Sequence, residues 1–244
     1  MNGLWLALDT ATDVASVAIG RDGKVLAGAH SQGARRHAAE ILRLVDLTLA
    51  NPGLRPADLD GIFVGDGPGS FTGLRIGWAT AKGLAQEAGL DVVTVPSLLA
   101  AAGAAAVRLG AVPIAACFDA LRGQVYAGLY VVDADRVATL LPPTVVTLEE
   151  LVARAPVVPK VVVGDGAVRY AEQVKRWCGI PPLSLDDLPA SAAIMVSLAG
   201  REGAGRALPD FATAEPEYGR PAEAQAKWEA RHGRPLPDPP RPPR

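Results

Sequence analysis

A four-residue motif occurs twice in the chain, at the same place in two similar series of predicted strands and helices. Val64–Gly67 reads Val-Gly-Asp-Gly after an apolar strand, and Val163–Gly166 repeats it after another apolar strand. An aspartate, Asp9 or Asp119, also ends the first strand of each series. At equivalent points of two β-β-β-α-β-α series, these matches indicate two copies of one supersecondary unit. The sequence therefore predicts an α/β fold with a sheet in each half.

Hydrophobic periodicity and turn signals give the predicted elements. In the first half, strands are expected at 4–9, 14–20, 24–29, 61–65 and 92–95, and helices at 34–49, 70–88 and 97–108. In the second half, strands are expected at 112–118, 124–132, 136–141 and 160–164, and helices at 147–153, 168–177 and 191–200. Thr147 and Glu150 form a predicted capping box. We therefore predict one lobe in residues 1–109 and a second in residues 110–220.

The remaining residues, 221–244, are expected to form a polar and then proline-rich tail. Residues 234–244 read RPLPDPPRPPR and contain six prolines without apolar periodicity. Proline removes backbone donors and favours the extended polyproline II conformation, so disorder is expected from about residue 234. An SH3-type ligand is the alternative interpretation of this segment.

Charge and apolar patterning exclude several classes of protein. The formal net charge is −2, so no cationic surface indicates direct binding of nucleic acid. The N-terminus has neither a basic flank nor a small-residue cleavage site, and no apolar run approaches the length of a membrane span. Cys117 and Cys178 lie far apart in apolar surroundings, which favours thiols in a reduced compartment over a disulfide. We therefore expect a cytoplasmic protein with no membrane partner.

The glycine-rich run Gly65–Gly77, GDGPGSFTGLRIG, is the most distinctive local signal. It predicts a tight turn followed by a helix that Ser70 caps, an arrangement that often binds anions. A P-loop requires Lys-Ser/Thr after its last glycine, but here Gly73 precedes Leu74-Arg75. The glycine spacing does not fit a dinucleotide-binding motif either. The run is therefore predicted to be a structural loop, built by Gly65, Gly67, Pro68, Gly69, Ser70 and Gly73.

Two predicted helices have apolar residues on more than one side. In the helix after the glycine run, Gly73, Gly77 and Ala81 form a stripe of small residues that lets another backbone approach closely. The helix at 34–49 likewise carries leucines off its main apolar stripe. A partner interface and close packing on the chain's own sheet explain this pattern about equally well.

Residues that could support catalysis are few. Asp9 and Asp119 could hold magnesium in a phosphotransferase. We favour loop aspartates that accept hydrogen bonds from nearby backbone amides, because neither loop has the glycines that would admit phosphate. A helix-borne metal pair needs histidines four residues apart, but Ile41 follows His37 at that spacing. The sequence therefore predicts no catalytic residues, no metal site and no cofactor site.

Several segments together resemble the TsaB family, also called YeaZ. They are LALDTATDVASVAIG at the start, RRHAAEIL at 35–42, GDGPGSFTGLRIG at 65–77, VPSLLA at 95–100, FDALRGQVYAGLY at 118–130 and AEPEYGR at 214–220. The resemblance spans about residues 4–220, in order and with consistent spacing.

The resemblance implies an ASKHA (actin-like ATPase) fold made of two tandem RNase H-like lobes. It also implies a non-catalytic scaffold and dimerisation subunit of the bacterial complex that threonylcarbamoylates the adenosine beside the anticodon of ANN-decoding tRNAs. The implied partners are the catalytic subunit TsaD and the ATPase TsaE. A homodimer of the free chain and a nucleotide at the interface with TsaD are possible, and tRNA is contacted only through the complex.

The resemblance also places the partner contacts on the first-lobe helices. The expected contact residues are His37, Ile41, Leu44, Val45, Phe71, Thr72, Arg75 and Trp78. On this basis Trp78→Glu or Ile41→Glu is predicted to abolish binding of TsaD while leaving the chain folded. The alternative function is an autonomous ATP-dependent phosphotransferase or hydrolase of the same fold. A metallopeptidase is disfavoured because the histidine pair is missing.

Overall fold

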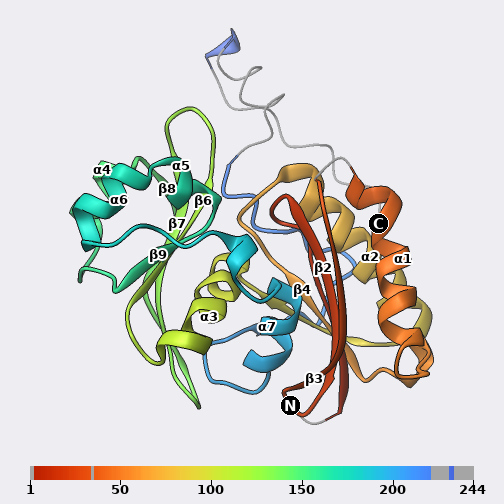
Figure 1. The fold of residues 1–244 in the computed structure, drawn as a ribbon. Coiled ribbons are helices and arrows are strands. Elements are labelled where there is room, and N and C mark those ends of the chain that lie inside the picture. The colour runs from red at the N-terminus through yellow and green to blue at the C-terminus, as the bar shows by residue number, and fades with distance from the viewer. Residues whose placement is uncertain (1–2, 34–35, 221–230, 234–244) are drawn as a thin grey trace.

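The computed structural model describes residues 3–33, 36–220 and 231–233 and contains two sheets with helices between them and on both outer sides (Figure 1). The layers follow from the burial pattern. Strand β1 (Leu4–Asp9) is buried along its whole length, as expected for a central strand that is covered on both faces.

The first sheet has the strand order β10-β5-β4-β1-β2-β3. β1, β2 (Val14–Arg21) and β3 (Lys24–Gln32) are antiparallel neighbours. β4 (Gly61–Gly65) and β5 (Asp91–Val95) run parallel to β1, and the short β10 (Arg206–Ala207) pairs with β5.

The second sheet has the strand order β8-β7-β6-β9. Read from β9, it matches the order β4-β1-β2-β3 of the first sheet. β6 (Ile114–Asp119), β7 (Val125–Val132) and β8 (Val137–Val146) are antiparallel, and β9 (Val161–Val163) is parallel to β6. Both copies of the Val-Gly-Asp-Gly motif therefore begin at the end of the strand that lies parallel to the first strand of their sheet.

Three apolar clusters hold the layers together. α1 (His37–Ala50) and α2 (Phe71–Ala88) cover the outer face of the first sheet through the side of β1 that carries Leu4, Leu6 and Leu8. α3 (Ser97–Leu109) and α7 (Ser191–Leu198) fill the space between the sheets. α4 (Leu148–Arg154), α5 (Asp165–Arg169) and α6 (Ala171–Cys178) cover the outer face of the second sheet. Short 3-10 turns lie at Pro56–Asp58 and Leu185–Asp187.

The predicted fold class is confirmed: the chain is α/β, with two RNase H-like sheets in tandem. Ser70 caps α2, since its Oγ accepts a hydrogen bond from the Gly73 N–H, and the Thr147–Glu150 capping box is present. Several details differ from the prediction, besides shifts of up to three residues at other element ends. β8 extends to Val146, β10 was not predicted, and the expected helix at 168–177 is divided at Tyr170, whose φ and ψ of −110° and 35° are not helical.

Two further sequence-based expectations concern the proline-rich tail and the lack of a membrane span. The proline-rich segment 234–244 lies outside the described residues. Within the described part of the chain, no helix is both long and apolar enough to cross a membrane.

Candidate functional site

The start of α2 packs directly on the loop that follows β1. A Cβ atom added to Gly69, Gly73 or Gly77 would lie well under 3.0 Å from Thr10 or Ala11. At Gly69 and Gly73 the nearest atom is a backbone carbonyl oxygen, of Ala11 and Thr10, and at Gly77 it is the Thr10 hydroxyl oxygen. A backbone carbonyl cannot rotate away, so glycine is required at Gly69 and Gly73. The small-residue stripe of α2 therefore faces the chain's own first sheet and not a partner.

Polar groups at the start of α2 are also used within the chain. The Ser70 N–H donates to the Ala11 carbonyl oxygen at 2.7 Å, and the Thr10 hydroxyl donates to the Gly73 carbonyl oxygen at 2.7 Å. The Gly73 N–H donates to Ser70 Oγ at 3.2 Å. This geometry supports the interpretation of Gly65–Gly77 as a structural loop, because a phosphate cradle needs free N–H groups at the helix start.

Asp9 lies beneath this contact and is 3% exposed. Its Oδ1 accepts hydrogen bonds from the Ala11 N–H at 3.1 Å and from the Ser97 hydroxyl at 3.0 Å. A Cβ atom on Gly65 would collide with the same carboxylate. Burial raises the pKa of Asp9, although these hydrogen bonds act in the opposite direction. Asp9 therefore behaves as a buried carboxylate that orders its own loop, as the sequence favoured.

We expect Asp9→Asn to stabilise the chain progressively as the pH rises from 4 toward 7. A raised folded-state pKa means that the folded chain binds the proton more tightly than the unfolded chain does. The contribution of Asp9 to stability is therefore full below about pH 4, the pKa of an unfolded aspartate, and is lost as the pH rises through the folded-state pKa. Asparagine does not titrate, and its side-chain oxygen can still accept from Ala11 and Ser97.

Urea unfolding at several pH values measures this difference. Asp46→Asn, at an exposed position of α1, is the control for the loss of one negative charge. A stability difference that instead moves in favour of the unchanged chain as the pH rises would show that the ionised Asp9 carboxylate stabilises the fold.

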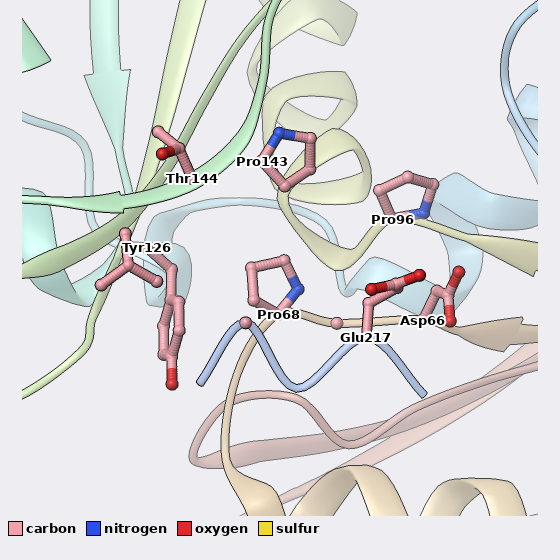
Figure 2. Close-up of a pocket in the computed structure, with 10 residues that line it drawn as sticks. Asp66, Pro68, Pro96, Tyr126, Pro143, Thr144 and Glu217 are labelled. Atoms are coloured by element: carbon pink, nitrogen blue, oxygen red, sulfur yellow. The ribbon is translucent and has the colours of Figure 1, made fainter. Parts of the chain in front are cut away.

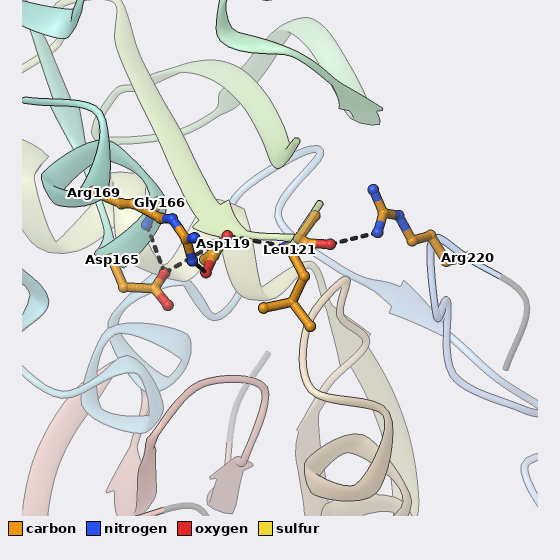
Figure 3. A network of polar contacts seen from close by, with 7 residues as sticks. Asp119, Leu121, Asp165, Gly166, Arg169 and Arg220 are labelled. Carbon is orange, nitrogen blue, oxygen red and sulfur yellow. Dashed lines mark hydrogen bonds and ion pairs between the residues drawn. The ribbon is translucent and has the colours of Figure 1, made fainter. Parts of the chain in front are cut away.

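A cleft of about 950 Å³ lies between the two halves of the chain. It is bordered by the loop after β1, the start of α2, the β6–β7 turn and the segment around Tyr218. In the β6–β7 turn, Leu121 and Arg122 both have positive φ, 60° and 52°. Arg220 donates to the Ala120 carbonyl oxygen (Figure 3) and to Gln124, and so fixes this turn.

The acidic side chains of this cleft are also paired within the chain (Figure 3). Asp119 Oδ2 accepts from Arg169 Nη1 at 2.5 Å, and Asp119 Oδ1 accepts from the Leu121 N–H at 3.0 Å. Asp165 Oδ1 accepts from the N–H groups of Asp119 and Gly166 at 3.2 and 2.9 Å. Burial raises the pKa of Asp165, and the nearby Asp119 charge raises it further. Among the described residues, no three His, Cys, Asp or Glu side chains form a potential metal site.

Five of the eight predicted partner contacts are buried within the chain, and the structure corrects their assignment to the surface. Each is at most 2% exposed and lies in or beside the core that α1 and α2 form with the first sheet: His37, Ile41, Leu44, Val45 and Trp78. Replacing Ile41 or Trp78 with glutamate would bury a carboxylate in this core. We therefore expect those variants to unfold the chain, contrary to the sequence-based prediction.

Trp78 was misplaced because a distant segment covers it. Its ring centroid lies 4.8 Å from that of Phe211, and its Nε1–H donates to the Gly65 carbonyl oxygen at 3.0 Å. Lys82, one turn further along α2, donates to the Ala214 carbonyl oxygen at 2.7 Å. The helix was apolar on more than one side because the sheet covers one side and residues 211–214 cover another.

The other three predicted contacts, Phe71, Thr72 and Arg75, are at least partly exposed. Tyr218 orders two of them. Its ring lies 4.6 Å from the Phe71 ring, and its hydroxyl oxygen accepts a hydrogen bond from Arg75 Nε at 3.0 Å. The Arg75 guanidinium stacks on the Phe71 ring at 4.3 Å. Tyr218 was not selected from the sequence, although AEPEYGR at 214–220 contains it.

The outward side of α2 carries a second stripe of small residues, which was not predicted from the sequence. Thr72, Ala79 and Gly83 are exposed, and a Cβ atom on Gly83 would meet no atom within 4 Å. On α1, Leu42 and Leu47 are 59% and 49% exposed. We call six of the exposed residues of these two helices the docking face: Leu42, Leu47, Thr72, Arg75, Ala79 and Gly83. Thr72, Ala79 and Gly83 are seven and four residues apart, and this helical spacing was the available sequence signal.

Comparisons with known proteins agree with this architecture. Residues 30–175 match the family model described as TsaD: tRNA N6-adenosine threonylcarbamoyltransferase. The chain is 30% identical to the tRNA threonylcarbamoyladenosine biosynthesis protein TsaB of Bacillus subtilis, over 91% of this chain and 96% of that protein. It is 41% identical to the Escherichia coli protein of the same name over 51% of this chain, a match that spans only 54% of that relative.

A solved structure is also similar. YeaZ from Pseudomonas aeruginosa superposes with a TM-score of 0.67 at 30% sequence identity, over 82% of this chain and 91% of that chain. Both the sequence and the arrangement of the two sheets therefore point to the same family.

Proposed function

The chain belongs to the TsaB (YeaZ) family, and from this premise we propose that it acts in tRNA threonylcarbamoyladenosine biosynthesis as a subunit without catalytic activity of its own. In this proposal it binds and activates TsaD, together with TsaE, and thereby supports threonylcarbamoylation of the adenosine next to the anticodon in ANN-decoding tRNAs. Its own part is to present a docking face.

The observation that carries this proposal is the packing of α2 on the loop after β1. In an ATPase of this fold, the loop with Asp9 would hold phosphate and magnesium. Here Asp9 is 3% exposed and the glycine face of α2 occupies the space above Thr10 and Ala11. The matched family model describes a transferase, but this chain has Ile41 four residues after His37 and so lacks a metal-binding histidine pair at that position.

The docking face supports the choice of a protein partner. The small residues Ala79 and Gly83 are exposed on α2, and small residues let a second helix approach closely. The exposed Leu42 and Leu47 on α1 add apolar area that association with a partner would bury. We propose TsaD as this partner, and a second copy of the chain as the alternative occupant when TsaD is absent. The proposal also includes a cytoplasmic location, indirect contact with tRNA, no cofactor bound by this chain alone, and a nucleotide only at the interface with TsaD.

Complementation tests this function directly. Cells depleted of the chain are expected to lose threonylcarbamoyladenosine from their tRNA, as measured by mass spectrometry of the nucleosides. Expression of the unchanged chain should restore the modified nucleoside. The double variant Asp9→Asn/Asp119→Asn should restore it as well, because neither carboxylate takes part in chemistry. Full modification in depleted cells would refute the proposed role, and failure of a folded double variant would refute the non-catalytic mechanism.

The 950 Å³ cleft is the observation that favours the alternative, an autonomous ATP-dependent phosphotransferase or hydrolase. Under our proposal, the purified chain alone turns over no ATP above the level of the Asp9→Asn/Asp119→Asn variant. Turnover that remains constant through successive purification steps and disappears in that variant would favour the alternative enzyme.

A further inference from the structure

A second, smaller pocket lies beside the glycine-rich loop, and three proline rings contribute to its lining. Its volume is about 310 Å³, within the range of sites that hold small groups. We call it the proline pocket, and its lining residues are Asp66, Gly67, Pro68, Pro96, Tyr126, Pro143, Thr144, Val145, Glu217 and Gly219. Figure 2 shows the rings of Pro68, Pro96 and Pro143 around the pocket, with Tyr126 at one side.

Two carboxylates stand at the other side of the proline pocket (Figure 2). Asp66 is 7% exposed, and its Oδ1 has no hydrogen-bond partner among the described residues. Its Oδ2 lies 3.6 Å from Nη2 of Arg206, a long separation to a side chain that is itself 63% exposed. Glu217 is exposed, and its backbone N–H donates to the Asp66 carbonyl oxygen at 2.9 Å, so the two acidic residues are held next to one another.

The electrostatics of this pair favour a cation. Burial raises the pKa of Asp66, and the charge of Glu217 raises it further, against the opposing effects of Thr94 and Arg206. An incoming guanidinium would offset both costs, because it supplies hydrogen-bond donors in a planar fork and a charge opposite to that of the two carboxylates. The pocket thus combines an apolar surface of rings with an anionic end.

The chain contains a segment of complementary chemistry. Residues 234–244, RPLPDPPRPPR, carry three arginines, six prolines and one aspartate. The described chain runs through Gly219, which lines the pocket, and the tail follows from there. The separation along the sequence permits contact, since an extended chain spans up to about 3.4 Å per residue. We propose that the proline pocket is a docking site for residues 234–244 of the same chain, with proline rings against Tyr126 and Pro143 and an arginine against Asp66 and Glu217.

Two general features of peptide recognition support this assignment. Proline-rich segments dock in grooves lined by aromatic rings because the polyproline II conformation is largely preformed, and so little conformational entropy is lost. A covalent tether also supplies an effective concentration on the order of mM, so a weak contact suffices. The docked tail would connect β7 and β8 of the second sheet with the loop after β4 of the first.

Paramagnetic broadening in the full-length chain tests this proposal. A nitroxide label is attached at Asp238→Cys, which removes the only acid of the segment and keeps every proline and arginine. Cys178 is replaced by serine, whereas Cys117 stays, because it is buried and burial raises the pKa of its thiol to about 12. The Thr144 and Val145 amides are expected to lose about half of their NMR intensity. The Val25 and Leu26 amides, on β3 in the other sheet, are the reference and should keep theirs.

Two matched variants test the chemistry of the contact. Glu217→Gln and Arg241→Gln/Arg244→Gln should each restore at least half of the lost intensity, and their spectra without the radical should report an unchanged fold. Equal intensities at the pocket and reference amides would overturn the proposal. Broadening at Thr144 and Val145 that increases with protein concentration would overturn it too, because the tail of another molecule would then be the occupant.

Discussion

The Gly83→Arg variant is expected to bind TsaD at least about a hundredfold more weakly than the unchanged chain while remaining folded. Gly83 lies on the exposed side of α2, and a Cβ atom there meets no atom of the chain within 4 Å. The arginine side chain therefore starts from open space and causes no steric clash at its Cβ atom within the chain. In a helix-to-helix interface, however, it separates two backbones that small residues let approach, and a loss of about 2.7 kcal/mol of binding free energy already corresponds to a hundredfold weaker complex.

Gly83→Ala is the matched control, because it keeps the residue small. Isothermal titration calorimetry of purified chain against TsaD should give unchanged affinity for Gly83→Ala and no measurable binding for Gly83→Arg at the same concentrations. If the Gly83→Arg variant binds as tightly as the unchanged chain, the outward side of α2 is not the docking face, and the partner site must be sought elsewhere. The spectroscopic fold of both variants is checked by circular dichroism.

The fold could be predicted from the sequence because its signals are local. Val64–Gly67 and Val163–Gly166 mark equivalent strand ends, and Ser70 and Thr147 identify the starts of two helices by hydrogen bonds within one turn. The division of the helix at Tyr170 and the pairing of β10 with β5 have no such local signal. They depend on packing between segments that are distant in the sequence.

The candidate site was harder to predict for the same reason. In the sequence, an apolar side chain such as Ile41 or Trp78 is equally consistent with a partner contact and with the protein core. Only the positions of the sheet and of Phe211 show that both side chains belong to the core. Small residues have the same ambiguity. Gly73 and Gly83 both lie within α2, and either could let another backbone approach the helix closely. In the structure Gly73 faces Thr10, whereas Gly83 faces solvent. Spacing alone does not tell which side of a helix the sheet covers.

The substitution of alanine for Gly73 is expected to lower the free energy of unfolding by about 1–3 kcal/mol. In an ordinary helix, glycine to alanine stabilises by up to about 1 kcal/mol. At Gly73, however, the new Cβ atom would meet the Thr10 carbonyl oxygen at far less than contact distance. Overpacking against backbone, which cannot rotate away, costs about 1–3 kcal/mol. The hydrogen bond from the Thr10 hydroxyl to the Gly73 carbonyl oxygen is lost as α2 moves away, which adds about 1 kcal/mol.

Gly83→Ala is the matched control for this prediction, because it is the same chemical change in the same helix. With open space around its Cβ position, it should raise the free energy of unfolding by about 0.5–1 kcal/mol. Urea unfolding of the two variants and of the unchanged chain measures both changes in the free energy of unfolding, the decrease for Gly73→Ala and the increase for Gly83→Ala. Two variants of equal stability would mean that α2 can shift on the Thr10 loop at little cost. The space above Asp9 would then be open to a ligand, and the packing of α2 would no longer exclude nucleotide chemistry in this half of the chain.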